Sequence, residues 1–422
     1  MIDINLLRQN PNTIRTALKN RQKDPKIVDQ ILEIDKNYRS ILSEVEKLRA
    51  EQNLLTRNFK GKPTNDQLKK ATNIKEKLKK LEIELKEIEN KQNLTLEEIP
   101  NIPSEDTPIG KDESENVVFK TVGDVPKFDF KPLDHVDLGE KLDIIDVKKA
   151  GQLSGSRFGF FKNQAAVLEM SLMFYAFQKL INKGFKGMIP PAMVKGDTEW
   201  KCGYTSNKNL FNAYYSSPED DLVFISSSEH VVVPYHMDEI LDTKNLPIKY
   251  VNFSPCFRRE AGTYGKDTRG MLRVHFFNKV EMNIFTLPDY KISDAMCLEM
   301  LAIQEELMQE LEIPYQVIKT CTGDLPQPNR RMYDINAWFP GQNAYRETHS
   351  CSNCGDYQAR RLNTKVKIDG QNELVHILNA TMVTDRAILA LLENHQQSDG
   401  SITIPKVLQN LTNFNLIKPT KI

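Results

Sequence analysis

The 422-residue sequence has no run of about eighteen apolar residues, so we expect no membrane-spanning helix. Its N-terminus, MIDINLLRQNP, lacks the apolar core of a secretory signal and the Arg- and Ser-rich character of a transit peptide. Its six cysteines show no disulfide-framework spacing, which indicates reduced thiols. We therefore expect a cytoplasmic protein with no membrane partner.

Several familiar site motifs are also missing. The chain contains no GxxxxGK[ST] phosphate loop, no GxGxxG turn and no HExxH zinc motif. The Cys351–Cys354 pair has the spacing of a zinc half-site, but no second pair at matched spacing follows, so we expect no zinc. Lys and Arg together number 57, as do Asp and Glu, so the net charge is zero and hides any local asymmetry.

Two segments near the N-terminus repeat apolar or neutral residues at alternating spacings of three and four, which is the pattern of a coiled-coil seam. The first series is Ile31, Ile34, Tyr38, Ile41, Val45, Leu48, Gln52, Leu55 and Phe59, and the second is Ala71, Ile74, Leu78, Leu81, Leu85, Ile88 and Gln92. Gly61–Asn65 between them has turn composition. The pattern predicts an antiparallel helical hairpin over about residues 27–98, with arms reaching roughly 50 Å.

Positive charge is concentrated at the far end of this hairpin. Two acidic residues, Asp66 and Glu76, stand there among nine basic ones, namely Arg57, Lys60, Lys62, Lys69, Lys70, Lys75, Lys77, Lys79 and Lys80. One interpretation is an ordinary solvated helix surface. The other is a surface that follows the phosphates of a folded RNA, since clustered Lys and Arg neutralise phosphates and release counterions.

The composition changes after the hairpin. A proline- and acid-rich stretch between about 100 and 118 predicts a domain boundary, which divides the chain into residues 1–105 and 106–422. In the second part, helical periodicity at 165–184, 292–311 and 384–395 alternates with strand-like runs but yields few βαβ units. This arrangement predicts an α+β domain, an antiparallel sheet flanked by helices.

One predicted β-hairpin, residues 253–282, carries an unusual amount of charge. Because side chains alternate along a strand, Arg273, His275, Phe277, Lys279 and Glu281 are expected on one face, with Arg258 and Glu260 sharing a face of the preceding strand. Val274, Phe276, Val280 and Met282 are expected on the buried face, together with Asn278. The charged face is either an ordinary solvent-facing surface or a binding site. Arginine forks bind phosphates and a flat aromatic stacks on a base, so a site for ATP beside an amino acid is the more specific interpretation.

The same residues resemble the seryl-tRNA synthetases of the common class II type. The resemblance covers nearly the whole chain and rests on MIDINLLRQNP, SGSRFGFF, FRREAGTYGKDTRGMLRVHFFNKVEM, YRETHSCSNCGDYQARR and LNATMVTDRAILALLENHQQSDGSITIPKVL. GFKGMIPP resembles the family's dimer-interface motif. The resemblance implies a serine–tRNA ligase that uses ATP with Mg²⁺, acts on L-serine and serine tRNA, and forms a homodimer. Its arm would hold the long variable arm of the tRNA through the nine basic residues named above.

The resemblance also implies roles for single residues. Arg258, Arg273 and Arg386 would be catalytic and bind phosphates, Phe277 would stack on adenine, and Glu347 and Ser350 would hold Mg²⁺. The implied ATP site consists of Arg258, Arg259, Glu260, Arg273, Val274, Phe277, Glu347, Thr348, His349, Ser350 and Arg386. The implied serine site consists of Ser227, Ser228, Glu229, Arg258, Lys279, Glu281, Asn379 and Thr381.

Some positions depart from the family pattern. The serine motif Thr-x-Glu is Ser227-Ser228-Glu229, and Asn336 stands where the family has an acid. Asn379 and Arg386 are seven positions apart, one fewer than expected, which predicts either a shift of Thr381 or a compensating bulge. An inactive paralogue that binds RNA or a partner protein is the alternative, but the retained arginines favour an enzyme.

Overall fold

The computed structural model describes residues 1–57, 63–205, 213–260 and 270–419. The chain divides into two compact units, Met1–Ile102 and Pro103–Ile422. Within the described residues, no helix is both long enough and apolar enough to cross a bilayer.

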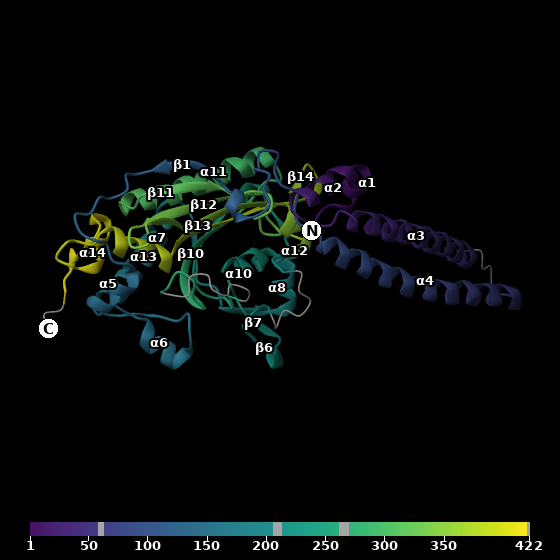
Figure 1. Cartoon of the computed structure of the whole chain (residues 1–422). Helices are drawn as coiled ribbons and strands as arrows, with labels where there is room; N and C mark the ends of the chain where they lie inside the picture. Colours follow the sequence, from purple (N-terminus) through teal and green to yellow (C-terminus); the bar gives the residue numbers. More distant parts are fainter. Residues whose placement is uncertain (58–62, 206–212, 261–269, 420–422) are drawn as a thin grey trace. The chain divides into compact units, whose positions relative to one another are not determined.

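The first unit is entirely helical in its described residues. Two short helices, α1 (Ile4–Gln9) and α2 (Pro11–Asn20), precede the long helices α3 (Ile27–Arg57) and α4 (Asn65–Glu97). Helix α4 begins with a capping box, in which Thr64 Oγ1 accepts from the Gln67 amide and Gln67 Oε1 accepts from the Thr64 amide. Figure 1 shows α3 and α4 running side by side.

The predicted seam holds the two long helices together. Val45, Ile74 and Leu78 are buried in one apolar cluster, with Ile41 and Leu81 among the half-buried residues around it. The described members of both predicted series are buried or half-buried, which confirms the heptad interpretation, while Phe59 lies outside the described residues. This apolar seam is therefore a main contact between the two long helices.

A buried carboxylate fastens the base of the hairpin. Asp35 of α3 has no exposed side-chain surface; it accepts hydrogen bonds from Arg8 Nε (2.9 Å) and Nη2 (2.6 Å) and from Gln92 Nε2 (2.9 Å), and it pairs with Arg39 (3.0 Å). Burial alone would raise the pKa of Asp35, but the Arg8 and Gln92 hydrogen bonds outweigh it and lower the pKa. The cluster joins α1, α3 and α4.

The second unit is built on an eight-stranded sheet in the order β1-β11-β12-β13-β16-β10-β9-β4. All neighbouring strands pair antiparallel except β4 and β9, which are parallel. The strands are β1 (Val117–Val122), β4 (Lys186–Met188), β9 (Ile248–Phe257), β10 (Phe276–Thr286), β11 (Tyr315–Lys319), β12 (Arg331–Phe339), β13 (Ala344–Gly355) and β16 (His376–Thr384). This confirms the predicted α+β class with an antiparallel sheet.

Helices cover one face of the sheet. The main apolar core lies between this face and the long helices, and it contains Val280, Met282, Ile335 and Ala380 from the strands. The covering helices are α7 (Asn163–Asn182), α11 (Tyr290–Glu310) and α13 (Asp385–Asn394). Figure 1 shows α11 on one side of the sheet and two shorter helices, α8 (Gly196–Cys202) and α10 (Glu229–Val232), on the other. The second face is therefore available for a site.

Shorter elements complete this unit. The remaining α-helices are α5 (His135–Lys141), α6 (Val147–Ser154), α12 (Tyr357–Leu362) and α14 (Lys406–Thr412), and the 3₁₀ helices are η1 (Glu113–Glu115), η2 (Pro218–Asp220), η3 (Val233–His236) and η4 (Thr243–Asn245). Small sheets consist of β15-β14-β8 (Gln371–Leu374, Lys365–Ile368, Ile240–Leu241), β5-β7-β6 (Met193–Lys195, Leu222–Phe224, Ser216–Ser217), β2-β3 (Ile145–Asp146, Phe160–Phe161) and β17-β18 (Ile402–Thr403, Leu416–Ile417).

The charged hairpin differs from its predicted form at one end. Strand β10 begins only at Phe276, so Arg273 and His275 precede the regular alternation. Phe276, predicted to be buried, is 42% exposed and packs at the strand end against Phe257 (ring centroids 5.4 Å apart). That prediction was wrong because Phe276 is the first residue of the strand and lies at its open end, where alternation does not ensure burial. Val280 and Met282 are fully buried as predicted.

Candidate active site

Two adjoining cavities lie on the face of the sheet opposite the main core. They share Arg258, Lys279, Glu347, Ser350 and Thr381 in their walls. The second cavity has a volume of about 390 Å³. The shared residues come from β10, β13, β16 and the end of β9, so pairing of these strands creates the site.

Three guanidinium groups line the first cavity, from Arg258, Arg273 and Arg386. Arg386 is fixed by two backbone acceptors, the carbonyls of Leu272 (2.9 Å from Nε) and Glu347 (2.9 Å from Nη1). Arg258 Nε donates to the Ser226 carbonyl (3.4 Å). Converging guanidinium groups on a cavity wall suit an anion with several oxygens, such as a phosphate chain.

Glu347 and Ser350 of β13 supply oxygen donors beside these arginines. Glu347 Oε2 lies 3.3 Å from Arg386 Nη1, and the Ser350 hydroxyl lies 3.4 Å from Thr381 Oγ1. Loss of hydration within the cleft opposes ionisation of Glu347, but Arg386 and Arg258 outweigh it and lower the pKa of this carboxyl. A carboxylate and a hydroxyl are hard oxygen ligands, which fit Mg²⁺ that also takes phosphate oxygens.

An aromatic ring forms part of the same cavity. The Arg258 guanidinium lies over the Phe277 ring, 5.0 Å from its centroid. Glu260 stands nearby at a positive φ of 50° and faces two guanidinium groups, Arg157 (3.6 Å) and Arg273 (3.7 Å). A ring face beside a charged rim can bind a flat heteroaromatic base. The sequence pattern assigns no role to Arg157, although this residue lies in SGSRFGFF, one of the segments that carry the family resemblance.

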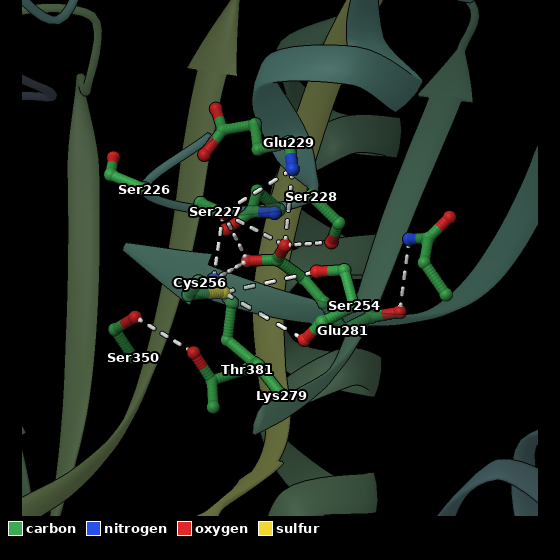
Figure 2. A network of polar contacts seen from close by, with 12 residues as sticks. Ser226, Ser227, Ser228, Glu229, Ser254, Cys256, Lys279, Glu281, Ser350 and Thr381 are labelled. Atoms are coloured by element: carbon green, nitrogen blue, oxygen red, sulfur yellow. Dashed lines mark hydrogen bonds and ion pairs between the residues drawn. The ribbon is translucent and has the colours of Figure 1, made fainter. Parts of the chain in front are cut away.

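The second cavity contains a fully buried carboxylate, Glu281, at the centre of a polar network (Figure 2). It accepts from the Ser227 hydroxyl (2.8 and 3.0 Å), the Ser228 hydroxyl, the Glu229 amide (3.1 Å) and Lys279 Nζ. Burial would raise its pKa, but the charge and hydrogen bond of Lys279 together with the hydroxyl donors lower it. Glu281 is thus held as an anion with Lys279 as its counter-charge.

A second carboxylate, Glu229, faces the same cavity from the start of α10. Tyr204 Oη donates to both of its oxygens at 2.8 Å, and Gln358 Nε2 donates to Oε1 at 2.8 Å. Burial and repulsion by Glu281 raise the pKa of Glu229. Tyr204 and Gln358 were missed by sequence reasoning, because no spacing rule connects them to a carboxylate far away in the chain.

The cavity walls contain most of the predicted residues. The first cavity contains, from the predicted ATP site, Arg258, Glu260, Arg273, Val274, Phe277, Glu347, Thr348, Ser350 and Arg386. The second contains, from the predicted serine site, Ser227, Glu229, Arg258, Lys279, Glu281, Asn379 and Thr381. Three predicted residues are placed differently: Arg259 lines the second cavity, Ser228 lines neither and binds Glu281, and His349 lines neither. His349 is buried, and burial lowers its pKa to about 4.

The spacing between Asn379 and Arg386 is accompanied by a bulge. In the pairing of β10 with β16, Val280 is opposite Val383 while Glu281 is opposite Thr381, so Met382 has no partner residue. Thr381 nevertheless lines both cavities, and Arg386 lines the first. Both side chains are therefore at the site, but this bulge adds a residue to β16 and so does not compensate for the shorter Asn379–Arg386 spacing.

Comparisons with known proteins agree with this arrangement. The seryl-tRNA synthetase N-terminal domain model matches residues 1–103, and the class II tRNA synthetase core domain model (G, H, P, S and T) matches residues 211–395. The serine–tRNA ligase of Pyrococcus horikoshii is 41% identical, with 100% of this chain and 98% of that protein covered. That of Dictyoglomus thermophilum is 41% identical over the full length of both. The chain belongs to the seryl-tRNA synthetase family.

Solved structures of this family superpose on the chain closely. The crystal structure of seryl-tRNA synthetase from P. horikoshii complexed with ATP has a TM-score of 0.93 at 40% identity and covers all of both chains. The cytoplasmic serine–tRNA ligase from Naegleria fowleri, in complex with AMP, has a TM-score of 0.90 at 31% identity and covers 100% of this chain and 99% of that one. The helical arm and the class II sheet are thus both features of the family.

The described basic residues of the arm are all exposed. Arg57 ends α3, and Lys69, Lys70, Lys75, Lys77, Lys79 and Lys80 lie on α4 around the buried seam residues Ile74 and Leu78. Lys70 lies 3.6 Å from Glu51. Lys60 and Lys62 lie outside the described residues. The described part of the basic surface is therefore open to a partner.

Proposed function

We propose that this seryl-tRNA synthetase family member activates L-serine with ATP and transfers the seryl group to the 3′ end of serine tRNA. The observation that carries the proposal is the pair of joined cavities, one with three guanidinium groups and the other with the buried carboxylates of Glu229 and Glu281. The guanidinium groups of the first cavity suit a triphosphate. The carboxylates of the second cavity suit a small molecule that bears an ammonium group. Their junction at Arg258 is where the α-phosphate and the serine carboxylate meet.

The first step forms seryl-adenylate. A serine carboxylate oxygen attacks the α-phosphorus of ATP, the bond to the bridging oxygen of the β-phosphate breaks, and pyrophosphate leaves. Arg258 stabilises charge at the α-phosphate, while Arg273 and Arg386 hold the outer phosphates. Glu347 and Ser350 would hold Mg²⁺, which supplies further charge neutralisation when bound. Positioning and electrostatics account for most of the catalysis.

The second step transfers the acyl group. A ribose hydroxyl of the terminal adenosine attacks the seryl carbonyl, and AMP leaves. No strong base is needed, because the adenylate is an activated mixed carboxylic–phosphoric anhydride and a phosphate oxygen of the departing AMP can take the hydroxyl proton. The exposed lysines of α4 bind the phosphates of the long variable arm of the tRNA through sequence-independent contacts.

We also propose that the chain acts as a homodimer. Helix α7 exposes Val167 (42%), Met170 (74%) and Phe174 (56%) along one face, and Ile189 is 80% exposed just after β4. Soluble monomers rarely leave such apolar stripes open. Light scattering tests this: the wild type should have twice the monomer mass, and Met170→Lys should reduce it.

The decisive test of function is ATP–pyrophosphate exchange with each amino acid in turn, without tRNA. Exchange with serine alone supports the proposal. No exchange with any amino acid, from folded protein that still binds ATP, would favour an inactive paralogue, for which the comparisons give no support.

A further inference from the structure

The two buried carboxylates of the serine cavity, Glu229 and Glu281, differ in how many of their acceptor positions are filled. An ionised carboxylate has about four lone-pair positions. At Glu281, Oε1 receives Ser227 and Lys279, while Oε2 receives Ser227, Ser228 and the Glu229 amide. Glu281 is therefore saturated before any substrate enters.

Glu229 has capacity left. Its Oε1 accepts from Tyr204 and Gln358, whereas its Oε2 accepts from Tyr204 alone among the residues that the structure describes. Figure 2 shows the Glu229 carboxylate turned away from the Glu281 network, with only its backbone amide directed into that network. Since Glu229 lines the cavity, this carboxylate can receive the substrate's only cationic group, the ammonium.

We infer that Tyr204 and Gln358 are positioning residues that orient Glu229 for the serine ammonium group. This inference rests on the proposed function. Both donors bind at 2.8 Å, and together they use Oε1 twice and Oε2 once, which leaves one acceptor position of Oε2 for the ligand. Without them, a carboxylate repelled by Glu281 would be able to rotate away from the cavity.

Both positioning residues are themselves held by buried neighbours. The Tyr204 ring stacks on His230, with centroids 5.1 Å apart and planes at 20°. His230 Nδ1 lies 2.7 Å from Glu199 Oε1, and both side chains are at most 3% exposed. Gln358 Nε2 also donates to the Cys202 carbonyl (3.2 Å). The orientation of Glu229 is thus fixed from α8, α10 and α12 together.

This role predicts a selective loss of serine affinity. In Tyr204→Phe, the ring and its stacking on His230 remain while the hydroxyl is removed. A hydrogen bond to a charged group corresponds to about tenfold to a hundredfold in affinity, so we expect the KM for serine to rise by that factor. The KM for ATP should stay unchanged, because Tyr204 and Gln358 do not line the phosphate cavity. Gln358→Met, which keeps the volume but removes the donor, should act in the same direction.

The matched control is Tyr250→Phe. Tyr250 is a buried tyrosine that, like Tyr204, stacks on a histidine. Its ring plane makes 24° with that of His236 and its hydroxyl lies 3.0 Å from His236 Nε2, but it lines neither cavity. Serine-dependent exchange, run with varied serine and varied ATP, should be unaffected by this change. Melting temperatures of all variants show whether any loss is due to misfolding.

The outcomes separate the inference from the proposed function. A wild type without serine-dependent exchange overturns the proposed function and this role with it. An active wild type, with the KM for serine unchanged in folded Tyr204→Phe and Gln358→Met, overturns the inference alone. Equal rises in the KM for serine and for ATP also overturn it, since they indicate a general structural role.

Discussion

The arm and the cleft each bury a carboxylate completely, Asp35 in one and Glu281 in the other, but they surround it differently. Two arginines and Gln92 bind the Asp35 carboxylate, and the resulting cluster lies between helices. Around Glu281, the counter-charge comes from Lys279 in a cavity wall, and a second carboxylate stands beside it. Charge in the arm's base thus serves cohesion, whereas charge in the cleft is arranged around a space that a ligand can fill.

We expect the largest difference in activity between one arginine substitution in the cleft and one in the arm. Arg386→Ala should lower serine-dependent pyrophosphate exchange by at least about a hundredfold, because it removes a fixed cation that stabilises developing phosphate charge. Arg39→Ala in the arm should leave exchange unchanged, since its partner is Asp35. Comparable exchange in the two variants would contradict the assignment of Arg386.

The next effect concerns the cohesion of the arm. Asp35→Ala removes the acceptor of Gln92, which is only 7% exposed, and should lower the free energy of unfolding of the arm by about 1–3 kcal/mol. Denaturant titration followed by circular dichroism measures this. The control is Glu82→Ala, which removes an exposed ion pair with Arg49 and should cost about 0–1 kcal/mol. Equal losses would show that the buried cluster is no more important than a surface pair.

A third change should weaken tRNA binding by the arm and leave adenylation in the cleft unchanged. Reversing charge at Lys75, Lys77 and Lys79 together should weaken tRNA binding by about tenfold and reduce its salt dependence by about 0.7–0.9 per lost phosphate contact. Exchange without tRNA should be unchanged. Lys86→Glu with Lys91→Glu, nearer the base of α4, is the control. An equal loss in the control would show that net charge matters rather than the position of the lysines.

The smallest expected effect is pH dependence in acid. Because the folded-state pKa of Asp35 lies below its ordinary value of 3.8, its stabilising contribution is complete above that value and is lost as the pH falls through the folded pKa. The arm of the wild type should therefore lose stability below about pH 4 more steeply than the arm of Asp35→Asn. Identical acid profiles would mean that the carboxylate charge does not contribute.

The sequence predicted those parts of the fold that depend on local pattern. The heptads locate α3 and α4, and the periodicity at 165–184 and 292–311 locates α7 and α11 within two residues at each end. It also predicted Val280 and Met282 as core, because alternation holds inside a regular strand. The prediction that Phe276 is buried was wrong, because alternation does not determine burial at the first residue of a strand, which lies at the open end of the sheet.

Strand alternation in the charged hairpin predicted part of the candidate site, and the family pattern supplied the rest. The residues that line the cavities came mostly from recognisable motifs, but Tyr204 and the buried Glu199–His230 pair lie outside them. Gln358 lies within YRETHSCSNCGDYQARR, but that motif assigned it no role. These contacts join residues from α8, α10 and α12, and only the folded chain brings them together. Helix periodicity and strand alternation carry no information on such long-range partners.

The strand order has a consequence for the order in which the protein is made. Strand β16 lies between β13 and β10, although it is the last strand of the large sheet in the sequence. A nascent chain that lacks residues 376–384 therefore holds two half-sheets, one with Glu347 and Ser350 and the other with Phe277 and Lys279, each with an unpaired inner edge. Such edges invite pairing with other chains. Nearly the whole polypeptide must therefore be synthesised before the two halves of the cleft can meet, whereas the arm, at the N-terminus, can form from local contacts much earlier.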